Sequence, residues 1–273
     1  MRAFRIAYDG QPYHGFQRQP DVPTVENRLF DALRALDILD GERVPPGYAA
    51  AGRTDSGVSA VSQTVAFDAP AWLSPAAFNS ELPGSIRAWA SASAPAEFHA
   101  THDATQRTYT YFLYAPDADE RAAREALSRL SGEHDFHNFT PDETGTQRTL
   151  SAELERDGPI FVLTFRAGGF ARQLVRRLVS VVVAVARGDA DEKRIERLLG
   201  SESLSGPAGI SPAPPTPLVL SGVRYPGLSF QVDTEAAATA RPVFENLRAE
   251  RVTSARVAGS IADVIDTSAS ENQ

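Results

Sequence analysis

The sequence contains no cysteine among its 273 residues, which excludes disulfide bonds and thiolate-based metal sites. The five histidines do not form a metal site in place of cysteine either, because their spacing does not match a metal-ligand pattern. They are His14, His99, His102, His134 and His137. We therefore expect a protein that holds no metal ion.

Long apolar runs are also missing from the chain. The longest, LVSVVVAVA at residues 178–186, falls short of the roughly 18 residues that a membrane-spanning helix needs, and arginines flank it on both sides. The first residues, MRAFRIAYDG, enter a strand-like alternation at once, without the apolar segment of a signal peptide. These features predict a cytoplasmic protein without a membrane partner.

Lysine is nearly absent, since Lys193 is the only one among 27 basic residues, and the formal net charge is −8. Scarce lysine together with abundant acidic residues, Ala and Val is typical of a GC-rich genome. It is also typical of an acidic, salt-adapted proteome, in which a negative surface favours solubility. A negative net charge by itself argues against a nucleic-acid partner.

The charge is unevenly distributed, however. Five arginines and no carboxylate lie between Arg166 and Arg187, whereas the residues from Gln231 onward contain seven acidic side chains and four arginines. The acidic average therefore hides a basic segment, which is a candidate for contact with a polyanion.

Strands and helices mix along the chain without strict alternation. Alternating apolar and polar residues predict strands at 2–8, 61–67, 86–92, 105–114, 148–156, 160–166 and 218–225. Helical spacing and capping residues predict helices after Thr24, after Ser74, and at about 119–130, 170–187 and 191–199. This order favours an α+β fold with a largely antiparallel sheet.

The length of the chain suits two such halves. We expect an N-terminal α+β half at residues 1–105 and a C-terminal α+β half at residues 106–232. An acidic extension, residues 233–273, has weak helical periodicity, and we expect it to be partly helical or frayed.

The segment AGRTDSGVSA, residues 51–60, is the most unusual part of the sequence. Gly52 and Gly57 flank Arg53 and Asp55, and glycine allows both tight backbone angles and the close approach of another molecule. One interpretation is a plain turn, in which Asp55 accepts backbone N–H groups. The other is a carboxylate nucleophile or base on an open loop, beside an arginine that attracts an anionic substrate. The residues alone leave both interpretations open.

This segment resembles the AGRTDAGVHA motif of the TruA-type tRNA pseudouridine synthases. Further segments resemble motifs of the same family, in the same order, over about residues 4–226. They are YDGQPYHGFQRQP, LPGSIRAW, FHATHDATQRTYTYFLY, GGFARQLVRRLVS and APPTPLVLSGVRYP.

The resemblance implies the isomerisation of uridine to pseudouridine in the anticodon stem-loop of tRNA, at positions 38, 39 and 40. The bond from C1′ to N1 breaks, the uracil rotates, and C5 bonds to C1′. Nothing is added or removed overall, so no redox cofactor or energy donor is required, and we expect no cofactor. The resemblance also implies a homodimer that clamps tRNA. It implies two ferredoxin-like-derived halves with helices on the outer face and an active-site cleft between them.

The resemblance also assigns roles to charged side chains. Asp55 corresponds to the essential carboxylate, and Arg176 to the guanidinium that keeps it ionised in a dry pocket. Arg53 corresponds to the arginine that helps to extract the target base. From the pattern alone, Arg176 is equally a solvated charge on a helix face shared with Arg172, four residues earlier. For Arg172 and Arg177 we expect phosphate contacts.

Tyr109, the first tyrosine of RTYTY, corresponds to the tyrosine that stacks on the extracted uracil and takes part in removing the C5 proton. Its alternative role is core packing, which we assign to Tyr111. Leu218 corresponds to an apolar position that lines the pocket, and it is equally a plain core residue. The sequence departs from the family pattern at Ser59, where histidine is usual, and at Pro217, where glycine is usual.

Two further functions remain open. One is a non-catalytic RNA-binding or tRNA-folding module with the same fold. The other is a hydrolase that uses Asp55 on a nucleoside or sugar, although no second general-acid carboxylate can be assigned. The joint presence of Asp55, Tyr109 and Arg176 favours the isomerase, because a module without catalysis has no need to keep all three.

Overall fold

The computed structural model describes residues 1–41 and 43–270. Residues up to 93 form the strands β1 (Arg2–Tyr8), β2 (Ala49–Ala50), β3 (Ser59–Phe67) and β4 (Ile86–Ser93), and the helices α1 (Val25–Ala35) and α2 (Pro75–Asn79). The next strands are β5 (Gln106–Tyr114), β6 (Gly132–Asp135), β7 (Gln147–Asp157), β8 (Ile160–Ala167) and β9 (Leu218–Arg224). They accompany α3 (Glu120–Leu130), α4 (Leu174–Ala186) and α5 (Glu192–Leu199). The chain closes with β10 (Gln231–Val232) and α6 (Thr234–Ser270).

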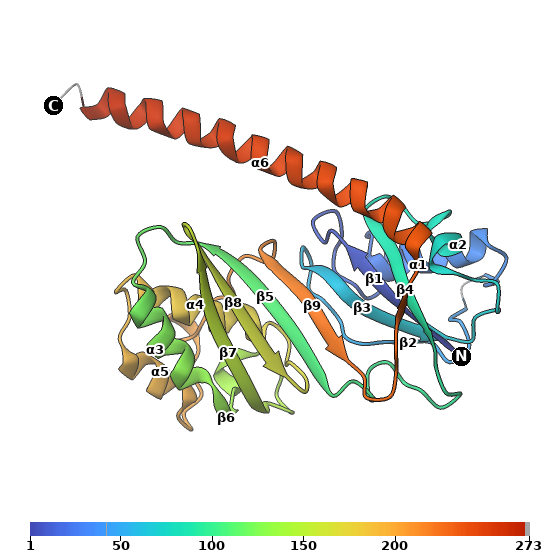
Figure 1. Ribbon diagram of the computed structural model, residues 1–273. Coiled ribbons are helices and arrows are strands. Elements are labelled where there is room, and N and C mark those ends of the chain that lie inside the picture. Colours follow the sequence, from blue (N-terminus) through green and yellow to red (C-terminus); the bar gives the residue numbers. More distant parts are fainter. Residues whose placement is uncertain (42, 271–273) are drawn as a thin grey trace.

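All ten strands belong to one mixed sheet, in the order β10-β4-β1-β3-β9-β5-β8-β7-β6, with β2 paired to β3 (Figure 1). The pairs are antiparallel except for β3 and β9, which run parallel. The predicted α+β fold with a largely antiparallel sheet is confirmed. None of the helices in the described residues is long and apolar enough to cross a membrane.

Two clusters of buried side chains form the core, and β9 contributes to both. The first cluster joins β1, β3, α1 and α2, with Phe4, Phe30 and Phe67 fully buried. The second fills the space between the sheet and α3, α4 and α5. Leu218 of β9 belongs to the second cluster, whereas Leu220 belongs to the first.

The seam between β3 and β9 is short. Only two residue pairs are in register there, Ser59 with Val219 and Ala60 with Leu220. Side chains reinforce it, because Arg5 donates to the carbonyl oxygen of Val223 at 2.6 Å. The seam therefore joins two separately packed cores through a small number of hydrogen bonds.

The basic helix begins later than the sequence pattern predicts. α4 starts at Leu174 rather than near Phe170, because Gln173 has a left-handed backbone with φ of 61° and cannot extend the helix backward. Arg172 therefore precedes the helix. The predicted i, i+4 face shared by Arg172 and Arg176 is wrong.

The extension after residue 232 forms one helix of 37 residues, α6, that runs away from the sheet (Figure 1). Its start packs against β4 and α2, where Ala236 and Ala240 are buried. From residue 248 to residue 265 every side chain is exposed. The helix is thus attached mainly at one end.

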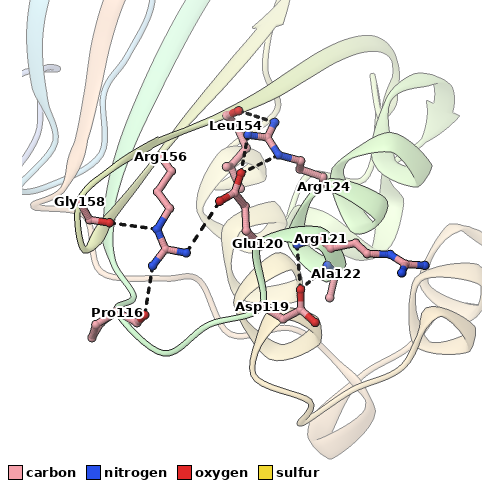
Figure 2. A network of polar contacts seen from close by, with 9 residues as sticks. All are labelled: Pro116, Asp119, Glu120, Arg121, Ala122, Arg124, Leu154, Arg156 and Gly158. Carbon is pink, nitrogen blue, oxygen red and sulfur yellow. Dashed lines mark hydrogen bonds and ion pairs between the residues drawn. The ribbon is translucent and has the colours of Figure 1, made fainter.

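An arginine-rich network fastens α3 to the hairpin of β7 and β8 (Figure 2). Arg124 binds Glu120 at 2.7 Å and donates to the Leu154 carbonyl, also at 2.7 Å. Arg156 lies 3.8 Å from the other Glu120 oxygen and donates to the Pro116 carbonyl at 3.2 Å. These contacts hold the loop before α3 in place, where Asp119 forms the N-cap.

Replacing the N-cap Asp119 with Ala should lower the free energy of unfolding by about 1 kcal/mol. The Asp119 carboxylate accepts hydrogen bonds from the backbone N–H groups of Arg121 at 2.8 Å and Ala122 at 3.1 Å, and these donors lose their protein partner in the variant. Denaturant unfolding at fixed salt measures the change. The matched control is Asp117→Ala, an exposed acid in the same loop that caps no helix; equal losses in the two variants would contradict the prediction.

Candidate active site

The loop between β2 and β3 turns Arg53 and Asp55 to the same side. Thr54, between them, is buried, and its hydroxyl shares a hydrogen bond of 2.7 Å with the hydroxyl of Tyr8. Arg53 is exposed and Asp55 is partly exposed. Arg53 and Asp55 both line one cavity, and the buried Thr54 anchors the chain between them.

Residues 9–16, here called the cradle segment, support this loop from below. Phe16 donates its backbone N–H to the Thr54 carbonyl at 3.1 Å, and Gly57 donates to the Tyr13 carbonyl at 3.3 Å. Gly10 donates its backbone N–H to the Ser59 hydroxyl oxygen at 3.0 Å. Ser59, which replaces the usual histidine of the family motif, thus helps to hold the loop.

Two glycines make this packing possible. At Gly10, an added Cβ would lie 2.2 Å from the Val58 carbonyl oxygen, so the two backbones meet where no side chain fits. Gly57 has φ of +79°, a conformation that side-chain-bearing residues rarely adopt. Gly52 has no atom within 4 Å of an added Cβ and borders open space. Glycine thus shapes the loop at residues 10 and 57, while residue 52 leaves access to it.

Asp55 forms an ion pair with Arg176 from the first turn of α4. Nη1 of Arg176 lies 3.2 Å from Oδ2 of Asp55, and the two side chains are 12% and 28% exposed. Arg176 is fixed from behind, because its Nε donates to the Ala213 carbonyl at 2.6 Å. The positive end of the α4 dipole lies on the same side as this guanidinium and also favours a negative carboxylate. Asp55 is therefore paired with a fixed guanidinium and still accessible.

Tyr109 of β5 places its ring at the same site. Its ring centroid lies 5.1 Å from that of Phe170, and the rings meet edge to face at 87°. Burial raises the pKa of Tyr109 well above its ordinary value, and the nearby charge of Asp55 raises it further. The phenol therefore stays protonated at neutral pH. Tyr111 is buried, and its hydroxyl donates to the Pro214 carbonyl at 3.1 Å, in keeping with a packing role.

These side chains surround one cavity of about 830 Å³. Elements from both core clusters contribute to its wall. Six of the seven predicted site residues line it: Arg53, Asp55, Tyr109, Arg172, Arg176 and Leu218. Arg177 is not among the lining residues, and its guanidinium donates to the Gln173 side chain at 3.3 Å.

Arg172 lies at the rim of the cavity, 60% exposed. Its backbone N–H donates to one Asp142 oxygen at 2.8 Å, and its Nε lies 3.3 Å from the other. The carboxylate of Asp142 therefore occupies a position next to Arg172 at which a phosphate oxygen would also bind favourably.

Arg107 is a residue of the site to which the sequence reasoning gave no role. It donates from Nε and Nη2 to the Ala51 carbonyl at 3.0 and 2.7 Å, and also to the carbonyls of Thr101 and Gly168. It thereby ties the start of the Asp55 loop to the turn that leads to Phe170. Burial lowers its pKa from the ordinary value. The sequence did contain a signal for this role, because Arg107 lies two residues before Tyr109 in the segment FHATHDATQRTYTYFLY that resembles a family motif.

Comparison with known proteins gives consistent matches. A family model described as tRNA pseudouridine synthase matches residues 126–226. The tRNA pseudouridine synthase A of Haloarcula marismortui is 59% identical over 273 residues, which covers 96% of this chain and 99% of that protein. The protein of the same name from Natronomonas pharaonis is 61% identical over 264 residues, with coverage of 96% and 99%. That of Methanothrix thermoacetophila is 40% identical over 236 residues, with coverage of 85% and 85%.

The matches to the relatives from halophilic archaea include most of helix α6. The uncovered 4% of this chain amounts to about 11 residues, whereas α6 has 37, so most of α6 lies within the matched part. The source of these relatives agrees with the acidic, lysine-poor composition.

Replacing Gly10 with Ala should destabilise the protein by about 2 kcal/mol or more, because the new methyl group overlaps the Val58 carbonyl and forces two backbones apart. Thermal unfolding of the variant beside wild type measures the effect. Gly169→Ala is the control, since its Cβ would meet no atom within 4 Å. An unchanged unfolding temperature for Gly10→Ala would show that the cradle segment does not pack as described.

Proposed function

The chain belongs to the tRNA pseudouridine synthase A family, and from this premise we propose that it isomerises uridine to pseudouridine in tRNA. One observation carries the proposal most directly. Asp55, Arg176 and Tyr109 come from three separate parts of the sequence, and all three line one open cavity. The reaction requires no redox cofactor or energy donor, because substrate and product are isomers.

In the proposed reaction, Asp55 supplies an ionised carboxylate beside C1′ of the target ribose. The Arg176 guanidinium, 3.2 Å from the carboxylate, is the cation that pairs with it in the cavity. The bond between C1′ and N1 breaks, the uracil turns within the cavity, and its C5 bonds to C1′ with loss of the C5 proton. The proton lost from C5 is balanced by the one gained at N1, so the atoms of the base are conserved.

The target base has to leave its stack, because a glycosidic bond inside a helix is out of reach. Arg53 is exposed at the cavity and suits the role of filling the space that the base leaves. Tyr109 offers an aromatic face to the extracted uracil, with Phe170 against its edge. Leu218 supplies an apolar wall.

The remaining parts of the proposal concern the RNA around the target. We assign Arg172 to a phosphate at the cavity rim and Arg177 to a phosphate outside it. The substrate positions are 38, 39 and 40 of the anticodon stem-loop, and two protomers clamp one tRNA in the cytoplasm.

Two ferredoxin-like-derived halves, residues 1–105 and 106–232, form the walls of an active-site cleft, and residues 233–273 form an extension. The two core clusters and the mixed lining of the cavity support this division.

Replacing Asp55 with Ala should abolish pseudouridine formation, because the variant lacks the carboxylate at C1′. Carbodiimide-based primer extension on unmodified tRNA, incubated with either protein, maps the product. Wild type should give stops in the anticodon stem-loop, and Asp55→Ala should give none. Asp117→Asn, an exposed acid outside the cavity lining, controls for the loss of a negative charge. Stops with both wild type and Asp55→Ala, or with neither, would contradict the proposal; binding of tRNA without stops would indicate a non-catalytic module.

Replacing Tyr109 with Ala should lower kcat/KM by about 5- to 150-fold, since base–aromatic stacking contributes about 1–3 kcal/mol. Single-turnover pseudouridine formation measures the loss. Tyr111→Phe is the control, because it removes only the hydroxyl that contacts the Pro214 carbonyl and should leave the rate near that of wild type. Equal rates for Tyr109→Ala and wild type would rule out stacking on this ring.

A further inference from the structure

The long helix α6 reaches back to the cradle segment through one arginine. Nη2 of Arg251 lies 2.9 and 2.8 Å from the two carboxylate oxygens of Asp9, and 2.9 Å from Oε1 of Gln11. These residues are about 240 positions apart in the sequence. A helix that packs on β4 and α2 at its start thus makes a second attachment, at the base of the loop that carries Asp55.

Asp9 is nearly buried, with 9% of its side chain exposed, whereas Arg251 is 43% exposed. The backbone N–H of Asp9 donates to the Ser85 carbonyl at 3.0 Å, which fixes its main chain at the end of β1. A buried carboxylate needs a partner for its charge, and Arg251 supplies it. Without that guanidinium, the carboxylate keeps the weak contact from the Gln11 backbone N–H at 3.4 Å but loses the cation that holds it, and the cradle segment can shift toward solvent.

Such a movement would reach Asp55 through a short series of contacts. Asp9 is bonded to Gly10, whose Cα lies against the Val58 carbonyl and whose N–H binds Ser59. Val58 in turn donates its backbone N–H to the Asp55 carbonyl at 3.1 Å. The packing at Gly10 leaves no free space, so a displaced cradle segment displaces the loop.

We propose that Arg251 is a positioning residue, through which α6 holds the cradle segment and thereby the Asp55 loop in the geometry that the reaction needs. This inference rests on the proposed function for its kinetic consequence, but not for its structural one. It gives the C-terminal extension a part in catalysis without any contact between α6 and the reacting atoms.

Arg251 is distinguished from a residue that binds RNA by what it contacts. Its Nη2 is directed at Asp9 and Gln11, whereas the side chains of Arg248 and Arg256 on the same helix make no hydrogen bond or ion pair with the described residues. An arginine that bound the tRNA backbone would change KM when removed. One that positions the loop would change kcat, because a small misplacement of a reacting group costs rate rather than affinity.

The test compares full-length wild type with Arg251→Ala, Arg251→Lys, Asp9→Asn and the control Arg256→Ala. Hydrogen exchange of the free protein comes first, since it needs no activity. Arg251→Ala and Asp9→Asn should raise exchange in peptides that cover residues 9–16 and 54–59, and should leave β7 and β8 unchanged. Arg256→Ala should match wild type throughout.

Kinetics on tRNA form the second measurement. Arg251→Ala should lower kcat between about 10- and 100-fold with KM within about two-fold of wild type. Arg251→Lys should recover part of the loss, because it keeps the charge. The double variant with Asp9→Asn should lose no more than the worse single variant, since both changes break the same contact.

Each other outcome overturns the inference. Unchanged exchange in both segments would show that Arg251 does not hold the loop. A raised KM with unchanged kcat would make Arg251 an RNA contact. Lower stability with normal kcat would reduce it to a structural residue. If wild type itself forms no pseudouridine, the proposed function fails, while the exchange comparison still decides whether Arg251 holds the loop.

Discussion

The ion pair between Asp55 and Arg176 is the contact on which the rest of the site depends. It joins residues 121 positions apart and needs three supports at once. The cradle segment has to set the Asp55 loop, α4 has to begin at Leu174, and the Ala213 carbonyl has to hold the guanidinium. A carboxylate that is only partly exposed can stay ionised when such a partner is fixed in place before substrate arrives.

Backbone packing, more than side-chain packing, sets the precision of the loop. Gly10 lets two chain segments approach more closely than a residue with a side chain would allow, and Gly57 adopts a φ of +79° that such residues rarely adopt. Arg107 adds hydrogen bonds to the carbonyls of Ala51 and Gly168, which link the loop to the turn before α4. The same few residues therefore serve both the fold and the placement of the reacting group.

Much of the fold was predictable from local pattern. β1 was predicted with its observed bounds, Thr24 caps α1 as expected, and the α+β class is confirmed. The start of α4 was not predictable, because helical spacing is blind to the left-handed backbone at Gln173. Neither was the return of β10 to β4, since strand pairing across more than 130 residues leaves no trace in local periodicity.

The candidate site divided in the same way. The residue pattern alone did not decide whether Asp55 is a turn residue or a catalytic acid. The family resemblance pointed to Arg176 as its partner, and the structure has Arg176 beside it. The role of Arg107 was missed because its acceptors are backbone carbonyls, which any sequence supplies. The contact between Arg251 and Asp9 was equally hidden, because a weakly periodic tail gives no sign of where its helix will pass.

The narrow seam between β3 and β9 has a mechanical consequence. Asp55 precedes β3, whereas Arg176 belongs to the cluster beyond β9, so a flexing motion at the seam would pull the two charges apart. The Asp55–Arg176 ion pair therefore keeps its length only while the seam keeps its geometry, so the few contacts across β3 and β9 govern the site as much as the residues that line it.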